Sequence, residues 1–365
     1  GKPKNNNMPE KLKSKDEQIL KDEQILGMLS ERHKALSELA KNYAEKLNKE
    51  SKGIKEAGPV FKDPDFAQGF IEKVGKMALE DVIKAVKIAE DKETGIDVNE
   101  IKIGFPEEKA KTAGATDDAA ASFSDNTIML SKQYYNALVK ELFEDFQAGD
   151  DVAIKVLQSV ASSDGNTRLA ETLPDKVLSK YRIGEKLEDR IEALAIYVYT
   201  RLVHESVHAV QYSRGAKEKE DNMIGIEGGA SFVEFYFANA LALINNKDTG
   251  KIASAVLKDT EPLVGAIEQV APFYGWKSLF TVRVSGEWIS SPVSPYDMGL
   301  YVFTKIYQTS IDQTSEPFVE TLKFMFSSLI KDGKISSDYD LYKDFEKKLH
   351  AQQTGSAADI MPLQR

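Results

Sequence analysis

The clearest pattern of apolar positions lies between Gly184 and Gly215, and it predicts a long buried helix. Apolar residues cover most of the helical circumference there: Leu194, Ile196, Val198, Tyr199, Leu202, Val203, Val207 and Val210. A helix that is apolar nearly all round is buried inside a protein. Acidic residues near its start and a glycine after its end are helix-boundary signals, so Gly215 is expected to end it.

Further helices are expected on both sides of this one. The stretch 228–246 is strongly apolar and predicts a second buried helix, and the stretches 66–91 and 132–149 also have helical spacing. Most of the region 251–350 shows the same kind of pattern. Helices therefore dominate the expected fold.

Strand signals are short and few. The alternating stretch 96–106 predicts a strand that ends at Pro106, and Ser124–Ser131 predicts another. The small and polar stretches 112–123 and 162–175 are expected to be loops. Together these features predict an α+β fold that is predominantly α-helical.

The N-terminal region, residues 8–57, is rich in charged residues interleaved with leucine. It contains the hexapeptide KDEQIL twice, at 15–20 and 21–26, and its apolar positions follow an approximate helical stripe. We expect a long surface helix or helical hairpin that packs on the body; a coiled coil that binds a partner is the alternative. His33, isolated among charges here, is expected to be solvated. A proline- and glycine-containing break is expected at 56–65.

Composition narrows the classes of function. The chain has 365 residues and a formal net charge of −10, which argues against a nucleic-acid partner. No apolar run approaches the roughly 18–20 residues needed to cross a bilayer, so we expect no transmembrane segment. Cysteine is absent, which excludes disulfides and cysteine-based metal sites.

The polar stretch 2–15 resembles a tether below a removed signal or lipid anchor. We therefore expect an exported bacterial protein (periplasmic, extracellular or lipid-anchored) rather than a cytoplasmic one; a plain disordered terminus is the alternative.

The candidate chemistry lies in the long helix, where His204 and His208 are separated by four positions and Glu205 follows the first. Side chains at i and i+4 project from one face of a helix, so both imidazoles can bind one ion. Glu205 would then lie beside the ion, in reach of a water bound to it. This is the H-E-x-x-H pattern of zinc hydrolases. A pair of hydrogen-bonded core histidines, or a site that has lost its metal, are the alternatives.

A catalytic zinc ion has three protein ligands and an open position, so a third ligand is needed. In the metzincin pattern, a glycine and a third histidine ligand follow the motif. The corresponding positions in this chain are Gln211 and Arg214, so that pattern is excluded. The carboxylates of Glu218, Glu220 and Asp221 fall in a polar loop that we expect to face water. Glu227 precedes three small residues at the start of the second apolar helix, where close packing could bring it against the histidines. We therefore predict Glu227 as the third ligand.

This arrangement resembles the gluzincin metallopeptidases, in particular their aminopeptidase-N-like branch. The resemblance rests on His204-Glu205-x-x-His208, eighteen intervening residues, then Glu227, and on the segment EGGASFVE. It covers roughly residues 124–303. It implies a zincin-like core with a small antiparallel sheet, an active-site helix and a glutamate helix, flanked by other helical regions. It also implies that Glu227 is a zinc ligand.

Further residues follow from the same resemblance. Glu234 would orient a ligand histidine, and Tyr296, in the segment PYDMGLYVF, would stabilise the oxyanion of the transition state. The strand Ser124–Ser131 would offer its edge to a bound peptide. The chain lacks the G-x-M-x-N segment with which that branch recognises a free amino terminus. An endopeptidase, or another amide hydrolase, therefore stays open beside an aminopeptidase.

The implied function is a zinc-dependent peptidase acting on peptides or proteins, with Glu205 as the general base. The alternatives are a non-catalytic binding or scaffold protein and an enzyme whose cleft is covered by its N-terminal helices. The expected regions are a tail and charged helical region at 1–57, the catalytic core at 58–250, a C-terminal helical region at 251–350 that contributes to the cleft, and a tail at 351–365. The sequence does not indicate the substrate or the oligomeric state.

Overall fold

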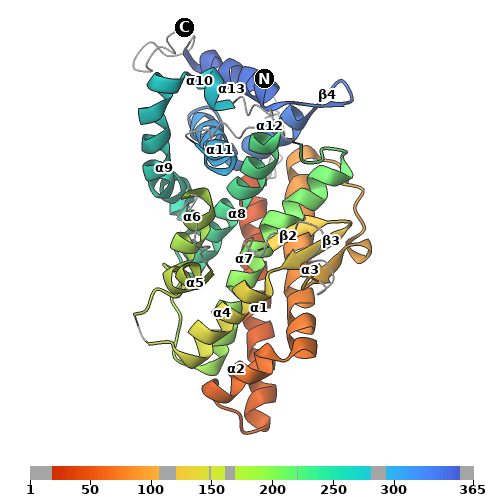
Figure 1. Ribbon diagram of the computed structural model, residues 1–365, viewed down its shortest axis with the longest axis vertical. Coiled ribbons are helices and arrows are strands. Elements are labelled where there is room, and N and C mark those ends of the chain that lie inside the picture. The colour runs from red at the N-terminus through yellow and green to blue at the C-terminus, as the bar shows by residue number, and fades with distance from the viewer. Residues whose placement is uncertain are drawn as a thin grey trace, which may run out of the picture.

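The computed structural model describes residues 19–106, 121–147, 149–160, 169–219, 221–280 and 293–353. The described part of the chain is mainly helical, as expected, and Figure 1 shows how its elements are arranged. Its α-helices are α1 (Lys21–Lys49), α2 (Ile54–Lys62), α3 (Pro64–Glu90), α4 (Lys132–Val139), α5 (Val152–Val160), α6 (Leu169–Leu178), α7 (Leu187–Ser213), α8 (Met223–Asn245), α9 (Ile252–Tyr274), α10 (Trp276–Phe280), α11 (Pro295–Ile311), α12 (Pro317–Leu329) and α13 (Asp338–Gln353). None of these helices is both long enough and apolar enough to span a membrane.

A small sheet is formed by β1 (Lys102–Gly104), β3 (Thr127–Leu130) and β2 (Ala121–Ser124), in that order. β2 and β3 make an antiparallel hairpin, whose Asp125 and Asn126 both have the positive φ angles of a tight two-residue turn. β1 pairs with β3 in parallel, so the expectation of an antiparallel sheet was wrong for this pair. A separate short ribbon joins β4 (Ile330–Lys331) to β5 (Lys334–Ile335).

The position of β3 corrects a second expectation. β3 was expected to offer its edge to a peptide, but it is paired on both sides, with β1 and with β2. Most of the hairpin partner β2 was expected to be loop, because the stretch 112–123 consists mainly of small and polar residues. In the described part of the sheet, β2 is the edge strand that contacts α7.

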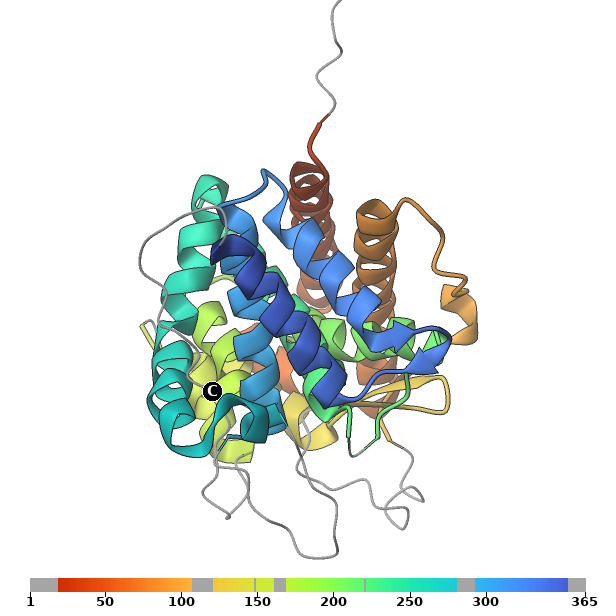
Figure 2. The ribbon, with the colours of Figure 1, turned by 90° about the horizontal axis from the view of Figure 1, so that it is seen from above.

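The long helix predicted over 184–215 is present as α7, and it lies at the centre of the fold. α7 packs against α1, α3 and α8, and its residues from Ala193 to Gln211 are all buried. In Figure 1, α7 and α8 lie between α1 and α3 on one side and α9 and α11 on the other. The view from above shows α12 and α13 crossing between these two groups (Figure 2). Because α7 is apolar around most of its circumference, it is stable only when other helices enclose it.

The N-terminal helix α1 belongs to the same packed core. Its apolar stripe, including Ile25, Leu29 and Leu36, is fully buried within the hydrophobic cluster that also contains α7 and α8. His33 was expected to be solvated, which is wrong. Its Nε2 atom lies 2.7 Å from the hydroxyl of Tyr181, because α1 packs against the body at this point. Residues 8–18 lie outside the described part of the chain.

Several element boundaries differ from the predictions. The expected break at 56–65 is mostly helix α2, with Pro59 inside it, and Asp63 caps the start of α3. The helix expected over 132–149 ends at Glu144 in a π-helical turn. α6 begins at Leu169, within the stretch 162–175 that was expected to be loop. Residues 162–168 and 112–120 of the two expected loops lie outside the described residues. So do 354–365 of the expected tail, whereas residues up to Gln353 belong to α13.

The position of α8 is fixed by a close helix crossing. A Cβ atom added to Gly299 of α11 would lie 2.3 Å from the Cα atom of Gly228 and 2.5 Å from the carbonyl oxygen of Ile224. Real Cβ contacts are never so short, so the backbones of α8 and α11 touch. Gly228 directly follows Glu227, and the crossing therefore sets the place of that carboxylate.

A carboxylate from another element also holds the start of α8. Asp338, at the start of α13, accepts hydrogen bonds of 3.1 Å from the backbone amides of Ile224 and Gly225. The first amides of a helix have no partner within the helix, so an acceptor there stabilises it. Burial raises the pKa of Asp338 to about 7.

We expect Gly299→Ala to destabilise the protein, because its methyl group would overlap the backbone of α8. Overpacking of a core costs about 1–3 kcal/mol of unfolding free energy. Gly69→Ala in α3 is the control, since a Cβ atom there meets nothing within 4 Å. A helical alanine is more stable than glycine by about 0.5–1 kcal/mol, so the control should gain stability. Urea unfolding measures both, and equal effects would contradict the close crossing.

Candidate metal centre

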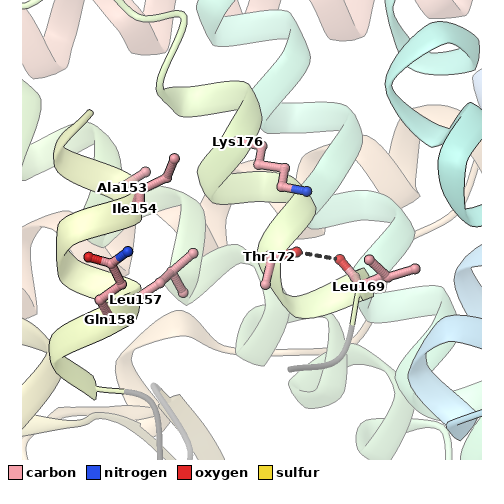
Figure 3. A pocket seen from close by; sticks show the side chains of 7 residues that line it. All are labelled: Ala153, Ile154, Leu157, Gln158, Leu169, Thr172 and Lys176. Carbon is pink, nitrogen blue, oxygen red and sulfur yellow. Dashed lines mark hydrogen bonds between the residues drawn. The ribbon is translucent and has the colours of Figure 1, made fainter. Parts of the chain in front are cut away.

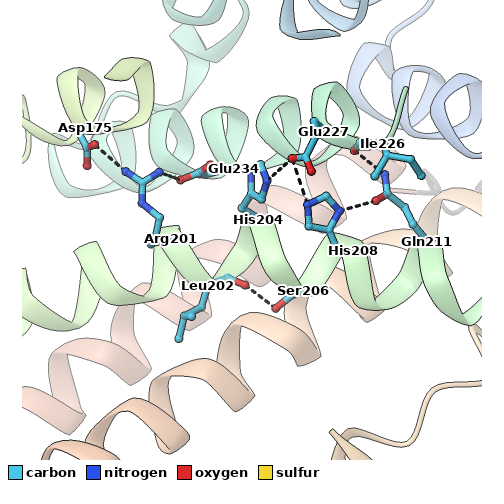
Figure 4. A network of polar contacts seen from close by, with 10 residues as sticks. All are labelled: Asp175, Arg201, Leu202, His204, Ser206, His208, Gln211, Ile226, Glu227 and Glu234. Carbon is cyan, nitrogen blue, oxygen red and sulfur yellow. Dashed lines mark hydrogen bonds and ion pairs between the residues drawn. The ribbon is translucent and has the colours of Figure 1, made fainter. Parts of the chain in front are cut away.

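Helices α7 and α8 bring together the three side chains that the sequence singled out as ligands. His204 and His208 project from α7 towards α8, and Glu227 projects back between them (Figure 4). The Oε2 atom of Glu227 lies 3.1 Å from Nε2 of His204 and 3.3 Å from Nε2 of His208. One ligand atom from each residue lies within 4.8 Å of the other two. We call these residues the His–His–Glu cluster.

The other nitrogen of each imidazole is held by a separate acceptor. Nδ1 of His204 lies 3.1 Å from Oε2 of Glu234, and Nδ1 of His208 lies 2.8 Å from Oε1 of Gln211. Gln211 is oriented because its amide nitrogen donates to the carbonyl of Ile226. Both acceptors hold one imidazole hydrogen on Nδ1, so Nε2, which faces Glu227, is the nitrogen of each ring that is left to bind a metal. Partners of this kind fix the orientation of metal-binding histidines.

Two ligand spacings in the cluster are close to those around a tetrahedral metal ion. Zinc–nitrogen and zinc–oxygen bonds are about 2.0–2.2 Å long, which puts two ligands of a tetrahedral ion about 3.3–3.5 Å apart. The two nitrogen–oxygen distances in the cluster, 3.1 and 3.3 Å, are close to this spacing. Two imidazoles and a carboxylate form a known zinc ligand set, although other divalent transition metals also accept it. The cluster is therefore suited to a divalent metal ion.

The charges in the cluster favour a cation. Burial opposes a charge on Glu227, but the two histidines outweigh it and hold the pKa of this carboxyl well below its usual range. Burial likewise opposes protonation of His204 and His208, but Glu227 raises the pKa of both, together with Glu234 and Glu205 at His204 and with Glu205 at His208. The raised pKa values favour protons on the nitrogens that a metal would bind. Metal binding must displace these protons.

Glu205 lies on α7 directly after the first histidine and is 5% exposed. Burial raises the pKa of its carboxyl, and the nearby histidines lower it. In the part of the chain that the structure describes, no side chain or backbone amide donates a hydrogen bond to this carboxylate. A buried carboxylate with a raised pKa and a free oxygen is suited to accept a proton.

The structure brings His204, Glu205, His208, Glu227 and Glu234 together. The loop carboxylate of Glu218 is exposed, as expected, but it is close enough to Glu227 for the charge of that residue to raise its pKa, after burial as the larger cause. Glu220 lies outside the described residues.

Tyr296 lies in the first turn of α11, half-buried against the core. This turn precedes the crossing of α11 with α8 at Gly299 and Gly228. The role of Tyr296 in oxyanion stabilisation stays a prediction.

Some residues around the cluster were not anticipated. Gln211 and Tyr212 follow His208 by three and four positions, and Arg201 precedes His204 by three, so helical spacing was the signal that could have found them. Asp175, which pairs with Arg201, gave no such signal, because it comes from α6 in a stretch expected to be loop.

Tyr212 is a second phenol near the cluster. Its ring centroid lies 6.0 Å from that of His208, and its ring packs edge-on against Phe123 of β2 at 5.4 Å. Burial, together with the charges of Glu218, Glu227 and Glu205, raises its pKa to about 12. The phenol therefore keeps its proton at neutral pH and is able to donate a hydrogen bond.

A pocket lies elsewhere, between α5 and α6 (Figure 3). Its volume is about 260 Å³, and apolar side chains such as Ile154, Leu157 and Leu169 line it, with Lys176 at one side. None of its lining residues belongs to the His–His–Glu cluster.

Comparison with known protein families, with curated proteins and with solved structures finds no match for this chain.

We expect the purified protein to bind one zinc ion per chain. Glu227→Gln should weaken this binding by about 100-fold or more, because the loss of a residue that only orients a ligand already lowers metal affinity by about 10–100-fold. Competition with a chromophoric chelator measures the affinity. Glu188→Gln, near the other end of α7, is the control and should bind zinc as the wild type does. Equal affinity of Glu227→Gln and wild type would show that Glu227 is not a ligand.

Proposed function

We propose that this protein is a zinc-dependent peptidase in which His204, His208 and Glu227 hold the metal. The observation that supports this best is the convergence of two imidazole Nε2 atoms on one carboxylate oxygen, with the hydrogens of both rings held on the opposite side. Two core histidines that served only packing would not need this arrangement. The sequence pattern adds Glu205 beside the cluster, at the position of a general base.

Zinc bound at this cluster would supply a Lewis acid and would lower the pKa of a water molecule towards neutrality. Glu205 takes a proton from the attacking water on its free carboxylate oxygen and passes it to the leaving amine. Its raised pKa suits this exchange, because a carboxylate with a low pKa is a weak base and accepts a proton poorly. Glu234 and Gln211 keep the two imidazoles in place throughout.

The proposed fold of this enzyme is a zincin-like core, with α7 as the active-site helix and α8 as the glutamate helix. The edge strand β2 supports a peptide substrate, because its outer backbone groups have no partner strand in the described sheet. An extended peptide is able to pair with such an edge. Contact between Phe123 of β2 and Tyr212 of α7 puts this edge beside the cluster.

A non-catalytic binding or scaffold protein with a structural metal ion is the second candidate. The observation that favours it is burial: His204, Glu205, His208 and Glu227 are only 5–8% exposed. Structural metal sites are closed, whereas catalytic sites keep an open position. Incubation of the zinc-loaded protein with a peptide library separates the two candidates, since only the peptidase would cleave peptides.

We expect Glu205→Gln to retain zinc but to lose turnover by about 10²–10⁴-fold, the usual contribution of a general base. His204→Ala should lose both zinc and turnover, and a chelator should abolish the activity of the wild type. Metal content and peptide cleavage are measured on the same samples. Full turnover by Glu205→Gln would show that another group is the base.

The two phenols are compared by Tyr212→Phe and Tyr296→Phe. A hydrogen bond to the oxyanion is worth about 10²–10³-fold in kcat, so loss of the donating phenol should lower kcat by this amount and leave zinc content unchanged. We expect this loss for Tyr212→Phe, because Tyr212 contacts His208. The same loss in Tyr296→Phe alone would instead support the assignment based on the sequence.

A further inference from the structure

A buried chain of charged side chains leads away from the His–His–Glu cluster. Oε2 of Glu234 accepts from His204, while its Oε1 lies 3.0 Å from Nη1 of Arg201. Nη2 of Arg201 donates a 2.7 Å hydrogen bond to Oδ2 of Asp175 (Figure 4). We call Asp175, Arg201 and Glu234 the arginine relay.

The relay joins three helices in the interior of the protein. Asp175 comes from α6, Arg201 from α7 and Glu234 from α8, and their exposed fractions are 2%, 8% and 3%. Arg201 precedes His204 by one helical turn, so both side chains lie on the face of α7 that meets α8. The guanidinium group also lies over the ring of Tyr134 from α4, at 5.3 Å. Its place is therefore fixed from several sides.

A buried charge is costly unless it is paired, and this guanidinium group is paired twice. The relay contains two carboxylates and only one cation, so one negative charge remains. This charge is directed at His204, whose Nδ1 hydrogen meets Glu234. The remaining charge favours a cation on the other side of the imidazole, where Nε2 faces Glu227.

Arg201 has a second effect on His204, through orientation. With Oε1 held by Arg201, the carboxylate of Glu234 is fixed with Oε2 against Nδ1 of the imidazole. Without Arg201 the carboxylate is free to rotate, and His204 is free to move its hydrogen to Nε2. An imidazole with hydrogen on Nε2 has no lone pair there for a metal.

We propose that Arg201, held by Asp175, is a positioning residue that sets the metal affinity of the cluster through Glu234. The inference rests on the metal site of the proposed function and not on its hydrolytic activity. The ion pairs of Arg201 are with Asp175 and Glu234 and not with a metal ligand, so it acts through another side chain.

A double-mutant cycle on zinc affinity tests the relay. Arg201→Met and Glu234→Gln should each weaken zinc binding by about 10–100-fold, the usual effect of an outer partner. The zinc affinity of the double variant should equal that of the single variant with the lower affinity. The two losses do not add, because Arg201 acts only through Glu234. Competition with a chromophoric chelator gives the four affinities. The absorption spectrum of the Co²⁺-loaded protein reports the ligand geometry, which should change in both single variants.

Arg214→Met is the matched control, since Arg214 directly follows α7 and also pairs with a carboxylate, Glu90 of α3. It should lower stability and leave zinc affinity and the Co²⁺ spectrum unchanged. Arg201→Lys, which retains a positive charge, should recover part of the affinity lost in Arg201→Met. If Arg201→Met does not fold, Arg201→Lys and Asp175→Asn take its place in the cycle.

The relay would be overturned if Arg201→Met bound zinc with the affinity of the wild type. It would also be overturned if the double variant lost affinity by the product of the two single losses, because the two residues would then act independently. If the wild-type protein binds zinc but cleaves no peptide, the proposed peptidase function is wrong. The double-mutant cycle on zinc affinity still tests the arginine relay in that case. A wild-type protein that binds no metal would overturn both.

Discussion

The contact of the Glu227 carboxylate with two imidazoles is the interaction on which the rest of this structure depends. It places ionisable groups from α7 and α8 where water is largely excluded, which is costly unless every charge is paired. Gln211 and Glu234 accept from the outer nitrogens, and Arg201 forms an ion pair with Glu234 in turn. The polar groups between α7 and α8 therefore form one connected network and not a set of separate ion pairs.

The apolar sequence of both helices makes this network possible. α7 and α8 expose almost none of their length, so they must be covered by α1, α3, α9 and α11. The covering lowers the local dielectric constant, and electrostatic interactions inside it are stronger than at the surface. The same helix thus supplies both the burial and the chemistry of the site. Its apolar residues keep water away, and its few polar residues lie between them.

The sequence predicted those parts of the site that depend on helical periodicity. The span of α7, the common face of His204 and His208, and the small residues beside Glu227 all follow from spacing or size along one helix. Contacts between distant elements were not predictable in this way. Asp175 lies in a polar stretch with Pro174 inside it, which concealed α6. Strand β2 has Phe123 as its one large apolar residue, which is too weak a signal for a strand, and its pairing with β3 makes it one.

The two glutamates of α8 show why the position of this helix matters for the site. Glu227 and Glu234 are seven residues apart, which places them on one face of α8, about two turns from each other. Both contact His204, one at Nε2 and the other at Nδ1. A shift of α8 along its axis would therefore disturb both sides of the same imidazole at once. The backbone contact of Gly228 with Gly299 and the Asp338 carboxylate at the start of α8 prevent such a shift. These distant contacts are thus as much a requirement of the metal centre as its ligands.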